Sequence, residues 1–350
     1  MKKVRAALIG CGSISRFHVD AILEAQGTLV YACDLNLNAA KDVAAKTGAE
    51  AIVDYRQILG DESVDVAHIV VDSKLHKEIS LAFIEAGKHV ICEKTLSENP
   101  ADSLEIVEYA NSKKRMLFTS YMKRYILAVE KAKELMGELG SLISARFFTR
   151  QPWGNLWEGA TDNPFFGVGP SGVSEVVKRY GGGILHCGGS HILDLINHLV
   201  GLPQSVSASQ IRPDYLDYDL KTAATFMING LDVQFEALAH PLNHIGLLND
   251  GWDEGFEIVG TKGKIVWQSS LWDDVVSKSS ILTHYKEDGE QVTYTYAPQS
   301  PFSRAIAAFY KDIVGGEQLS QSPWSGYHVD EMIAKIGLSA SQEKAVRFQW

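Results

Sequence analysis

The stretch that decides the fold is Val4-Arg5-Ala6-Ala7-Leu8-Ile9-Gly10-Cys11-Gly12, a short and largely apolar run that ends in two glycines. After it, apolar residues recur at helical spacing as far as Ala25, which predicts a strand, a tight turn and a helix. Glycines at such a turn let the backbone approach a pyrophosphate, and the helix start offers the positive end of its dipole. We therefore expect contacts to a dinucleotide from Gly10, Gly12, Ser13 and Ile14.

A pair of glycines also occurs in ordinary turns, so the glycines need support from a second feature. An acidic residue further along the chain provides that support. Asp34 ends a second apolar strand, Thr28 to Cys33, about 20 residues after the glycines. Its carboxylate can accept hydrogen bonds from the adenosine ribose hydroxyls and would repel a 2′-phosphate. The sequence thus predicts NAD as the cofactor and disfavours NADP. A helix cap or a turn acid is the alternative role for Asp34.

Strands and helices alternate along the first third of the chain. Apolar runs predict strands at 64–71, 88–92 and 115–119, and helical periodicity separates them at 75–86 and 101–112. This alternation predicts a parallel, doubly wound sheet.

Lys94 directly follows the strand that ends at Cys92. Open α/β sheets bind ligands outside the carboxyl ends of their strands, so we expect Lys94 to meet a substrate. A surface lysine paired with Glu93 is the alternative.

Composition and charge narrow the classes of protein that remain. The 350 residues are 45% hydrophobic, enough for two domains with cores, and the formal charge is -10. An acidic chain with scattered lysines and arginines would repel a phosphate backbone, which argues against nucleic-acid binding. No apolar stretch approaches the roughly 20 residues that cross a bilayer, so we expect no membrane partner. The four widely spaced cysteines form no CxxC pair and indicate reduced thiols in the cytoplasm.

Several motifs together resemble the glucose-fructose oxidoreductase, inositol dehydrogenase and rhizopine-catabolism (Gfo/Idh/MocA) family. The resemblance begins at Ala86-Gly87-Lys88-His89-Val90-Ile91-Cys92-Glu93-Lys94 and includes the glycine turn and Asp34. The other landmarks follow in the expected order over most of the chain: His76, Arg124 within Tyr121-Met122-Lys123-Arg124-Tyr125, Gly181-Gly182-Gly183, Gly189, His191 and Asp194.

The resemblance implies an α/β Rossmann domain at 1–121 that binds NAD, with further cofactor contacts from His76, Glu93 and Lys94. It implies an α+β domain at 122–350 with a large, open, mostly antiparallel sheet, whose face commonly forms the interface of a homodimer or homotetramer. Alternating apolar strands agree with this at 142–148, 206–210, 223–227, 233–239, 256–259, 265–267 and 292–296. Two helices predicted near 301–314 and 327–344 are expected to pack back against the rest of the protein.

The implied activity is NAD-dependent oxidation of a secondary ring hydroxyl in a sugar, glycoside or cyclic polyol. Hydride leaves the carbon and the hydroxyl loses its proton, so a base must lie within about 3 Å of that hydroxyl. By the resemblance, His191 is the general base, and Lys94 hydrogen-bonds to the hydroxyl and polarises it. Which of the two accepts the proton stays open, because burial and oxidised nicotinamide can lower the pKa of a lysine. We expect a structural role for Asp194.

Arg124, Trp153 and Cys187 complete the expected substrate-binding set with Lys94 and His191. An insertion at 151–180 contains four large aromatic residues whose faces suit the apolar side of a sugar ring: Trp153, Trp157, Phe165 and Phe166. The alternative is that this loop packs against its own sheet or a neighbouring subunit.

Two positions depart from the family's pattern. The family usually has proline after the lysine, often with a cis peptide, whereas this chain has Thr95, for which a cis bond costs about 3 kcal/mol. The family also usually has aspartate four residues before the histidine, whereas this chain has Cys187, a poorer hydrogen-bond acceptor. These departures keep two functions open: a glycosidase or epimerase that oxidises its sugar transiently with retained NAD, and a non-catalytic nucleotide-sensing protein.

A metal site is a further alternative, because four residues of metal-binding types recur on one face of a predicted helix: Cys187, His191, Asp194 and His198. Along one straight helix they extend about 16 Å, too far to meet at one ion, although two of them could join His240 or His244. We predict no metal site.

Overall fold

The computed structural model describes residues 3–159, 181–274 and 277–350, and the chain divides into two compact units. The first unit comprises 1–122 with 300–330, and the second comprises 123–299 with 331–350. The boundary expected from sequence, between 121 and 122, lies one residue from this division. The segment 300–330 differs from the expectation, because it belongs to the first unit rather than to the second domain.

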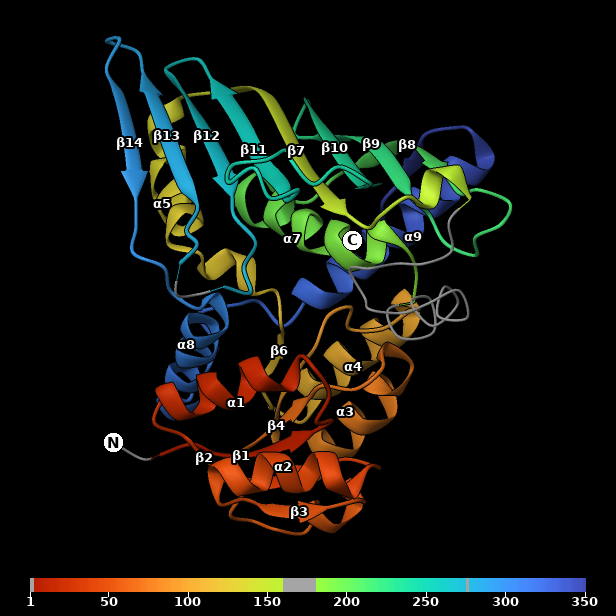
Figure 1. Cartoon of the computed structure of the whole chain (residues 1–350), viewed down its shortest axis with the longest axis vertical. Coiled ribbons are helices and arrows are strands. Elements are labelled where there is room, and N and C mark those ends of the chain that lie inside the picture. The colour runs from red at the N-terminus through yellow and green to blue at the C-terminus, as the bar shows by residue number, and fades with distance from the viewer. Residues whose placement is uncertain (1–2, 160–180, 275–276) are drawn as a thin grey trace. The chain divides into compact units, whose positions relative to one another are not determined.

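The first unit is built on a six-stranded parallel sheet (Figure 1). Its strands are β1 (Arg5–Ile9), β2 (Thr28–Cys33), β3 (Glu50–Ile52), β4 (Val66–Ile69), β5 (His89–Cys92) and β6 (Leu117–Thr119). They lie in the order β3-β2-β1-β4-β5-β6, and each strand pairs in parallel with its neighbours. This order confirms the predicted Rossmann fold, in which the direction of winding reverses between β1 and β4.

Four helices connect these strands: α1 (Ser15–Glu24), α2 (Leu37–Thr47), α3 (His76–Glu85) and α4 (Pro100–Ser112). Local sequence sets their ends. The Asn36 side chain accepts a hydrogen bond from the Asn38 N–H at the start of α2, and Gly48 ends that helix with φ of 75°. Asn99 caps α4, and Pro100 occupies the first turn, where a missing N–H costs nothing. The sequence predictions did not include α2 or the short β3.

Helix α8 (Pro301–Gly315) belongs to the first unit although eight of the nine strands of the second sheet precede it in sequence. It packs on α1 (Figure 1). Its Phe302 stacks on Phe17 of α1 with ring centroids 5.2 Å apart, and its Phe309 stacks on Phe118 of β6 at 4.4 Å. This aromatic packing buries apolar surface of the Rossmann sheet and explains why 300–330 joins the first unit.

Helix α9 (Ser325–Gln342) begins in the first unit and carries the buried Asp330. The Oδ2 atom of Asp330 accepts hydrogen bonds from the Ser97 N–H at 2.9 Å and from the Ser103 hydroxyl at 2.6 Å. Burial raises the pKa of Asp330 to about 8, against the opposing effect of these hydrogen bonds. The carboxyl group is therefore mostly protonated in the folded protein at neutral pH.

We expect Asp330→Asn to stabilise the protein increasingly as the pH rises from about 5 to about 8. The folded-state pKa of Asp330 lies above its unfolded value, so the stability that the protonated acid contributes is complete below the unfolded pKa. That stability is lost as the pH rises through about 8. Asparagine keeps an acceptor oxygen and never ionises. Urea unfolding of both proteins across this pH range measures the difference, and a difference that does not change with pH would contradict the prediction.

The second unit is built on a nine-stranded sheet (Figure 1). Its strands are β7 (Leu142–Pro152), β8 (Ser205–Ile211), β9 (Lys221–Ile228), β10 (Leu231–His240), β11 (Asp253–Gly260), β12 (Gly263–Ser269), β13 (Ile281–Lys286), β14 (Gln291–Thr295) and β15 (Val346–Arg347). They lie in the order β14-β13-β12-β11-β7-β10-β9-β8-β15. Among the described pairs, β7 with β10 is parallel and the others are antiparallel. The predicted mostly antiparallel sheet is confirmed, although the predictions missed β13 and β15.

Helices cover one face of this second sheet. Helix α5 (Leu127–Leu135) contacts β12 and β13, and α7 (Ser190–Leu199) contacts β7; Figure 1 shows both helices on the same side of the strands. The strands alternate in burial, and exposed apolar side chains such as Ile211, Met227 and Tyr285 lie at the positions that point away from the buried face. Among the helices of the described residues, none has the length and apolar character to cross a membrane.

Candidate active site

The turn between β1 and α1 is shaped for close approach by a ligand. Gly10 has φ of 98°, and a Cβ there would lie 2.0 Å from the Val70 carbonyl oxygen, so only glycine fits. An added Cβ at Gly12 would have no heavy atom within 4 Å, and both Gly12 and Ser13 are exposed. Helix α1 begins after Ile14 without a side-chain cap, so its positive end can act on an anion. The turn therefore fits a pyrophosphate.

Asp34 lies at the carboxyl end of β2. Its Oδ2 atom accepts a hydrogen bond from the Cys11 N–H at 2.8 Å, and its Oδ1 atom accepts one from the Asn36 N–H at 2.7 Å. Each oxygen keeps a second lone pair, which fits ribose hydroxyl donors. The adjacent Leu35 is 91% exposed, an apolar candidate for contact with adenine that the predictions did not include. Its signal in the sequence is a large apolar residue directly after the acid.

We expect Asp34→Asn to shift the ratio of the dissociation constants for NADH and NADPH by about tenfold in favour of NADPH, which corresponds to about 1.4 kcal/mol. The change removes a charge that repels the 2′-phosphate and keeps an acceptor oxygen for the turn. Fluorescence titration with each cofactor measures both constants. Asp42→Asn, which neutralises an exposed acid of α2, is the matched control. An unchanged ratio in Asp34→Asn would contradict the predicted role of Asp34.

The backbone around Lys94 is held from both sides. The Lys94 N–H donates to Glu93 Oε2 at 3.2 Å, and the peptide bond between Lys94 and Thr95 is cis. His76 is 1% exposed, with Nδ1 2.8 Å from the Thr95 carbonyl oxygen and Nε2 3.0 Å from that of Val71. Burial lowers the pKa of His76, so a neutral ring donates to one of these carbonyls. The structure thus shows His76 holding the segments beside Lys94.

His191 lies in the first turn of α7, directly after a π-helical turn at Leu185–Gly189. Turns of this kind are frequent at functional sites. His191 is 7% exposed and Cys187 is half-buried. Because a π turn contains more residues than an α turn, Cys187 and His191 do not have the spacing expected along a straight α-helix. Gly188 allows the turn to approach β7, since a Cβ there would lie 2.1 Å from Gln151 Nε2.

Arg124 forms a bidentate ion pair with Asp194 of α7. The Nε atom lies 2.6 Å from Oδ2, and a second guanidinium nitrogen contacts Oδ1; the side chains are 11% and 1% exposed. Burial raises the pKa of Asp194, and the charge of Arg124 opposes this. The pair ties the segment Met122–Tyr125 to α7, as the structural role expected of Asp194 requires. Substrate binding by Arg124 stays a prediction.

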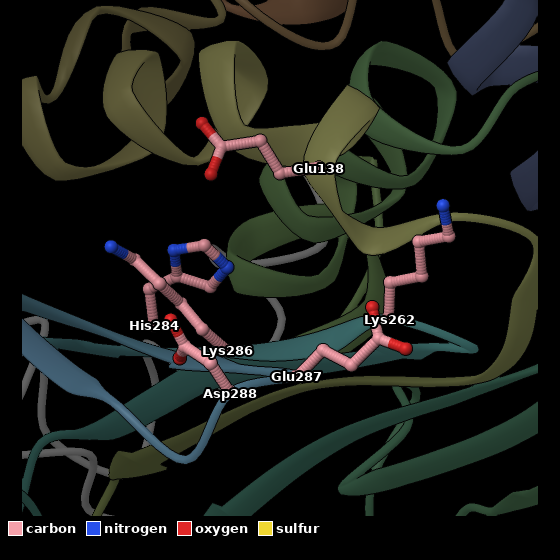
Figure 2. Close-up of a pocket in the computed structure, with 6 residues that line it drawn as sticks. All are labelled: Glu138, Lys262, His284, Lys286, Glu287 and Asp288. Atoms are coloured by element: carbon pink, nitrogen blue, oxygen red, sulfur yellow. The ribbon is translucent and has the colours of Figure 1, made fainter.

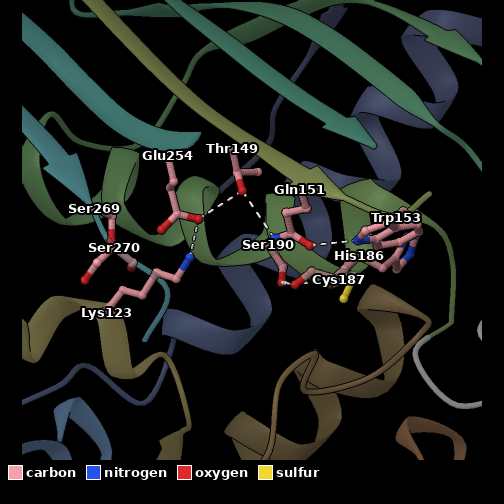
Figure 3. Close-up of polar contacts among 10 residues, drawn as sticks. All are labelled: Lys123, Thr149, Gln151, Trp153, His186, Cys187, Ser190, Glu254, Ser269 and Ser270. Carbon is pink, nitrogen blue, oxygen red and sulfur yellow. Dashed lines mark hydrogen bonds and ion pairs between the residues drawn. The ribbon is translucent and has the colours of Figure 1, made fainter. Parts of the chain in front are cut away.

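A buried polar chain that the predictions missed runs along β7 (Figure 3). Lys123 and Glu254 form an ion pair whose side chains are 1% and 0% exposed. The Thr149 hydroxyl donates to Glu254 Oε2 at 2.9 Å, and Gln151 Nε2 donates to Thr149 Oγ1 at 3.3 Å. The Trp153 indole N–H then donates to Gln151 Oε1 at 3.0 Å. The chain therefore connects the buried ion pair to the π turn that precedes His191.

The predicted strand ended at 148, whereas β7 continues to Pro152. The available signal was the alternation of Thr149 and Gln151 on one strand face, which Trp153 continues directly after the strand. Trp153 is fully buried, so its ring supports the end of β7. Trp157 is 36% exposed and donates to the Ala239 carbonyl oxygen at 2.7 Å. The other two aromatic residues of the insertion, Phe165 and Phe166, lie outside the described residues.

Within 3–159, 181–274 and 277–350, no group of three or more His, Cys, Asp or Glu side chains is arranged to hold a metal ion. Asp194, one of the four residues considered as a helical ligand stripe, is paired with Arg124. The metal alternative therefore gains no support from the described residues.

A shallow depression on the second unit carries charges of both signs (Figure 2). Its lining residues are Glu138, Lys262, His284, Lys286, Glu287 and Asp288. Lys286 is already paired with Glu290 at 2.5 Å. The lining includes none of the predicted site residues, so the depression is not the candidate active site.

Comparison with protein families accounts for both units. Residues 4–121 match the model of an oxidoreductase family with an NAD-binding Rossmann fold (GFO_IDH_MocA), and residues 129–266 match the model of the GFO/IDH/MocA C-terminal domain. Together the matched ranges extend over most of the chain, and they confirm the resemblance inferred from its motifs.

Individual relatives share these features. The chain is 23% identical over 353 residues to myo-inositol 2-dehydrogenase of Thermotoga maritima, which covers 97% of this chain and 96% of that protein. It is 28% identical over 178 residues to levoglucosan dehydrogenase of Pseudarthrobacter phenanthrenivorans, which covers 50% and 43%. A solved structure of levoglucosan dehydrogenase in complex with NADH and levoglucosan aligns over 100% of both chains, with 22% identity and a TM-score of 0.84. This last similarity shows a common fold.

Proposed function

Since this chain belongs to the Gfo/Idh/MocA family of oxidoreductases with an NAD-binding Rossmann fold, we propose that it oxidises a secondary ring hydroxyl of a cyclic polyol, sugar or glycoside with NAD. The observation that carries the proposal is the combination, within the first unit, of an open glycine turn, Asp34 and Lys94 at strand ends. The relatives named as inositol and levoglucosan dehydrogenases support this substrate class.

The residues of the first unit fit a dinucleotide. The open side of Gly12 and the start of α1 suit the pyrophosphate, and Asp34 suits the adenosine ribose. Further cofactor contacts are proposed for Gly10, Ser13, Ile14, His76, Glu93 and Lys94. When bound, NAD accepts the hydride from the carbon that bears the hydroxyl.

In this proposal, Lys94 and His191 have separate roles at the reacting hydroxyl group. The Lys94 ammonium donates a hydrogen bond to the reacting oxygen and stabilises the negative charge that develops there. A ring nitrogen of His191 takes the proton as the carbon–oxygen double bond forms. The electrons of the O–H bond remain with the new carbonyl, so charge and atoms balance.

The polar chain of the second unit would support His191 through the π turn. Gln151 contacts that turn at Gly188 and is itself held by Thr149 and Trp153. We assign further substrate contacts to Cys187 and Arg124. For Trp153 we propose a structural role, in which its ring supports the edge of the site.

We also propose that the exposed face of the second sheet joins copies of the chain into a homodimer or homotetramer. Its exposed apolar side chains, among them Ile211 and Met227, support this role. We also propose a cytoplasmic location, in line with the wide spacing of the four cysteines in the sequence. Light scattering in solution measures the oligomeric state, and a monomer at micromolar concentration would contradict the interface.

A screen of cyclic polyols, anhydro sugars and glycosides for NADH formation tests the function. We expect NADH with at least one compound from wild-type protein. NAD binding without turnover of any compound would favour a non-catalytic nucleotide-sensing protein. Release of an aglycone without net NADH would instead indicate a glycosidase that retains its cofactor.

A further inference from the structure

Four titratable side chains form a continuous buried chain next to Lys94, within the first unit. Glu93 Oε1 lies 2.9 Å from His18 Nε2, His18 Nδ1 lies 3.0 Å from His68 Nδ1, and His68 Nε2 lies 2.8 Å from the Tyr310 hydroxyl. Both histidines are 0% exposed, Tyr310 is 4% exposed and the Glu93 side chain is 12% exposed. The four residues come from α1, β4, α8 and the end of β5, and the hydrogen bond between His68 and Tyr310 joins residues 242 positions apart.

The facing ring nitrogens restrict where the protons lie. One hydrogen must lie between His18 Nδ1 and His68 Nδ1, because two bare lone pairs repel and two N–H groups clash. Burial lowers the pKa of His68 well below its usual range, and the neighbouring His18 lowers it further, so His68 is neutral. Burial alone would raise the pKa of Glu93, but the hydrogen bond from His18 helps to bring it below its usual value.

With Glu93 ionised, one arrangement satisfies every bond with neutral rings. The Tyr310 hydroxyl donates to His68 Nε2, His68 Nδ1–H donates to His18 Nδ1, and His18 Nε2–H donates to the ionised Glu93. Burying four polar groups in a core is costly unless each is hydrogen-bonded, and a fully satisfied network rigidifies the residues that it joins. The chain therefore ends in a carboxylate that has one orientation.

We propose that His18, His68 and Tyr310 are positioning residues for Lys94 and act through Glu93, an inference that rests on the role of Lys94 in the proposed function. His18 holds one oxygen of Glu93, which leaves the other to accept the Lys94 N–H at 3.2 Å. The network thereby sets the backbone from which Lys94 extends and keeps a negative charge beside its ammonium group. His18, His68 and Tyr310 touch neither the reacting hydroxyl nor the cofactor.

Competitive acetylation with a limiting amount of acetic anhydride, read by peptide mass spectrometry with and without NAD, tests the inference without a substrate. His18→Leu removes the donor to Glu93, so the buried acid tends to protonate and Lys94 loses its neighbouring anion. We expect acetylation of Lys94, relative to the exposed Lys46, to rise at least about threefold. His18→Gln keeps an N–H donor and should return the ratio to within about twofold of wild type.

Two further variants separate positioning from general stability. Tyr310→Phe removes a single hydroxyl and should raise the Lys94 ratio by less than His18→Leu does. If His18→Leu does not fold, the Lys94 ratio of Tyr310→Phe tests the inference by itself. Ser103→Ala removes a buried hydroxyl hydrogen bond to Asp330 elsewhere in the first unit and should leave the ratio unchanged.

With a substrate from the screen, His18→Leu should lower kcat by about tenfold or more and leave the dissociation constant for NAD within about threefold. Equal acetylation of Lys94 in wild type, His18→Leu and Tyr310→Phe would overturn the inference. Changed acetylation in a protein that turns over no polyol or sugar would reject the proposed function and leave the positioning network standing.

Discussion

Replacement of Lys94 by alanine is expected to lower kcat/KM for the oxidised polyol or sugar by about 100- to 1,000-fold. A group that donates a hydrogen bond to an oxygen on which charge develops contributes about this much when it acts mainly in the transition state. The loss should fall mostly on kcat, since the ammonium interacts more strongly with the developing alkoxide than with the neutral hydroxyl. Steady-state kinetics with the substrate found by the screen measure both constants.

The dissociation constant for NAD distinguishes this role from a loss of the cofactor site. Alanine at position 94 leaves the glycine turn and Asp34 in place, so we expect NAD to bind within about threefold of wild type. Lys74→Ala, which removes an exposed lysine after β4, is the matched control and should retain turnover. Near-normal kcat/KM in Lys94→Ala would show that the site assignment is wrong.

Breaking the buried ion pair between Lys123 and Glu254 is expected to lower the free energy of unfolding by about 3–5 kcal/mol. Both side chains are nearly inaccessible, so Lys123→Met leaves a carboxylate in the interior and Glu254→Gln leaves an ammonium group there. An uncompensated buried charge costs more than the pair itself contributes. Urea unfolding of each single variant measures the loss.

The double variant Lys123→Met/Glu254→Gln separates the two effects. It leaves no charge behind, and the amide oxygen introduced by Glu254→Gln can still accept from the Thr149 hydroxyl, so its stability should lie much closer to wild type than that of either single variant. Lys286→Met breaks a partly exposed pair with Glu290 in the same unit and should change stability little. Additive losses in the double variant would mean that the two side chains do not act as a pair.

Much of the fold could be predicted because local patterns agree with the final structure. Apolar runs of strand length, helical periodicity and a glycine turn are properties of neighbouring residues, and they predicted five of the six strands of the first sheet. The elements that were missed have weak local signals. Strand β3 has three residues, β15 has two, and β13 carries polar residues such as His284 and Lys286 among its apolar ones.

For a related reason, some residues of the candidate site were predicted from the sequence and others were missed. Gly10, Gly12, Asp34 and Lys94 lie at strand ends, where sequence position and spatial position coincide in a parallel sheet. Lys123 and Glu254 are 131 positions apart, and neither has a local pattern that indicates its partner. The π turn before His191 also escaped prediction, because its sequence resembles the start of an ordinary helix.

The sequence by itself determined the class of the molecule: a Rossmann unit with an NAD-type carboxylate at the end of its second strand, followed by a mostly antiparallel sheet. It also identified Lys94 and His191 as the residues to test. Tertiary structure alone decided that 300–330 joins the first unit, that Arg124 pairs with Asp194, and that Glu93 is held by a chain ending at Tyr310. The physical reason is the separation in sequence over which each feature is determined. Backbone conformation and amphipathic burial depend on residues a few positions apart. The partner of a buried charge depends on which distant segments the packed core brings within hydrogen-bonding distance.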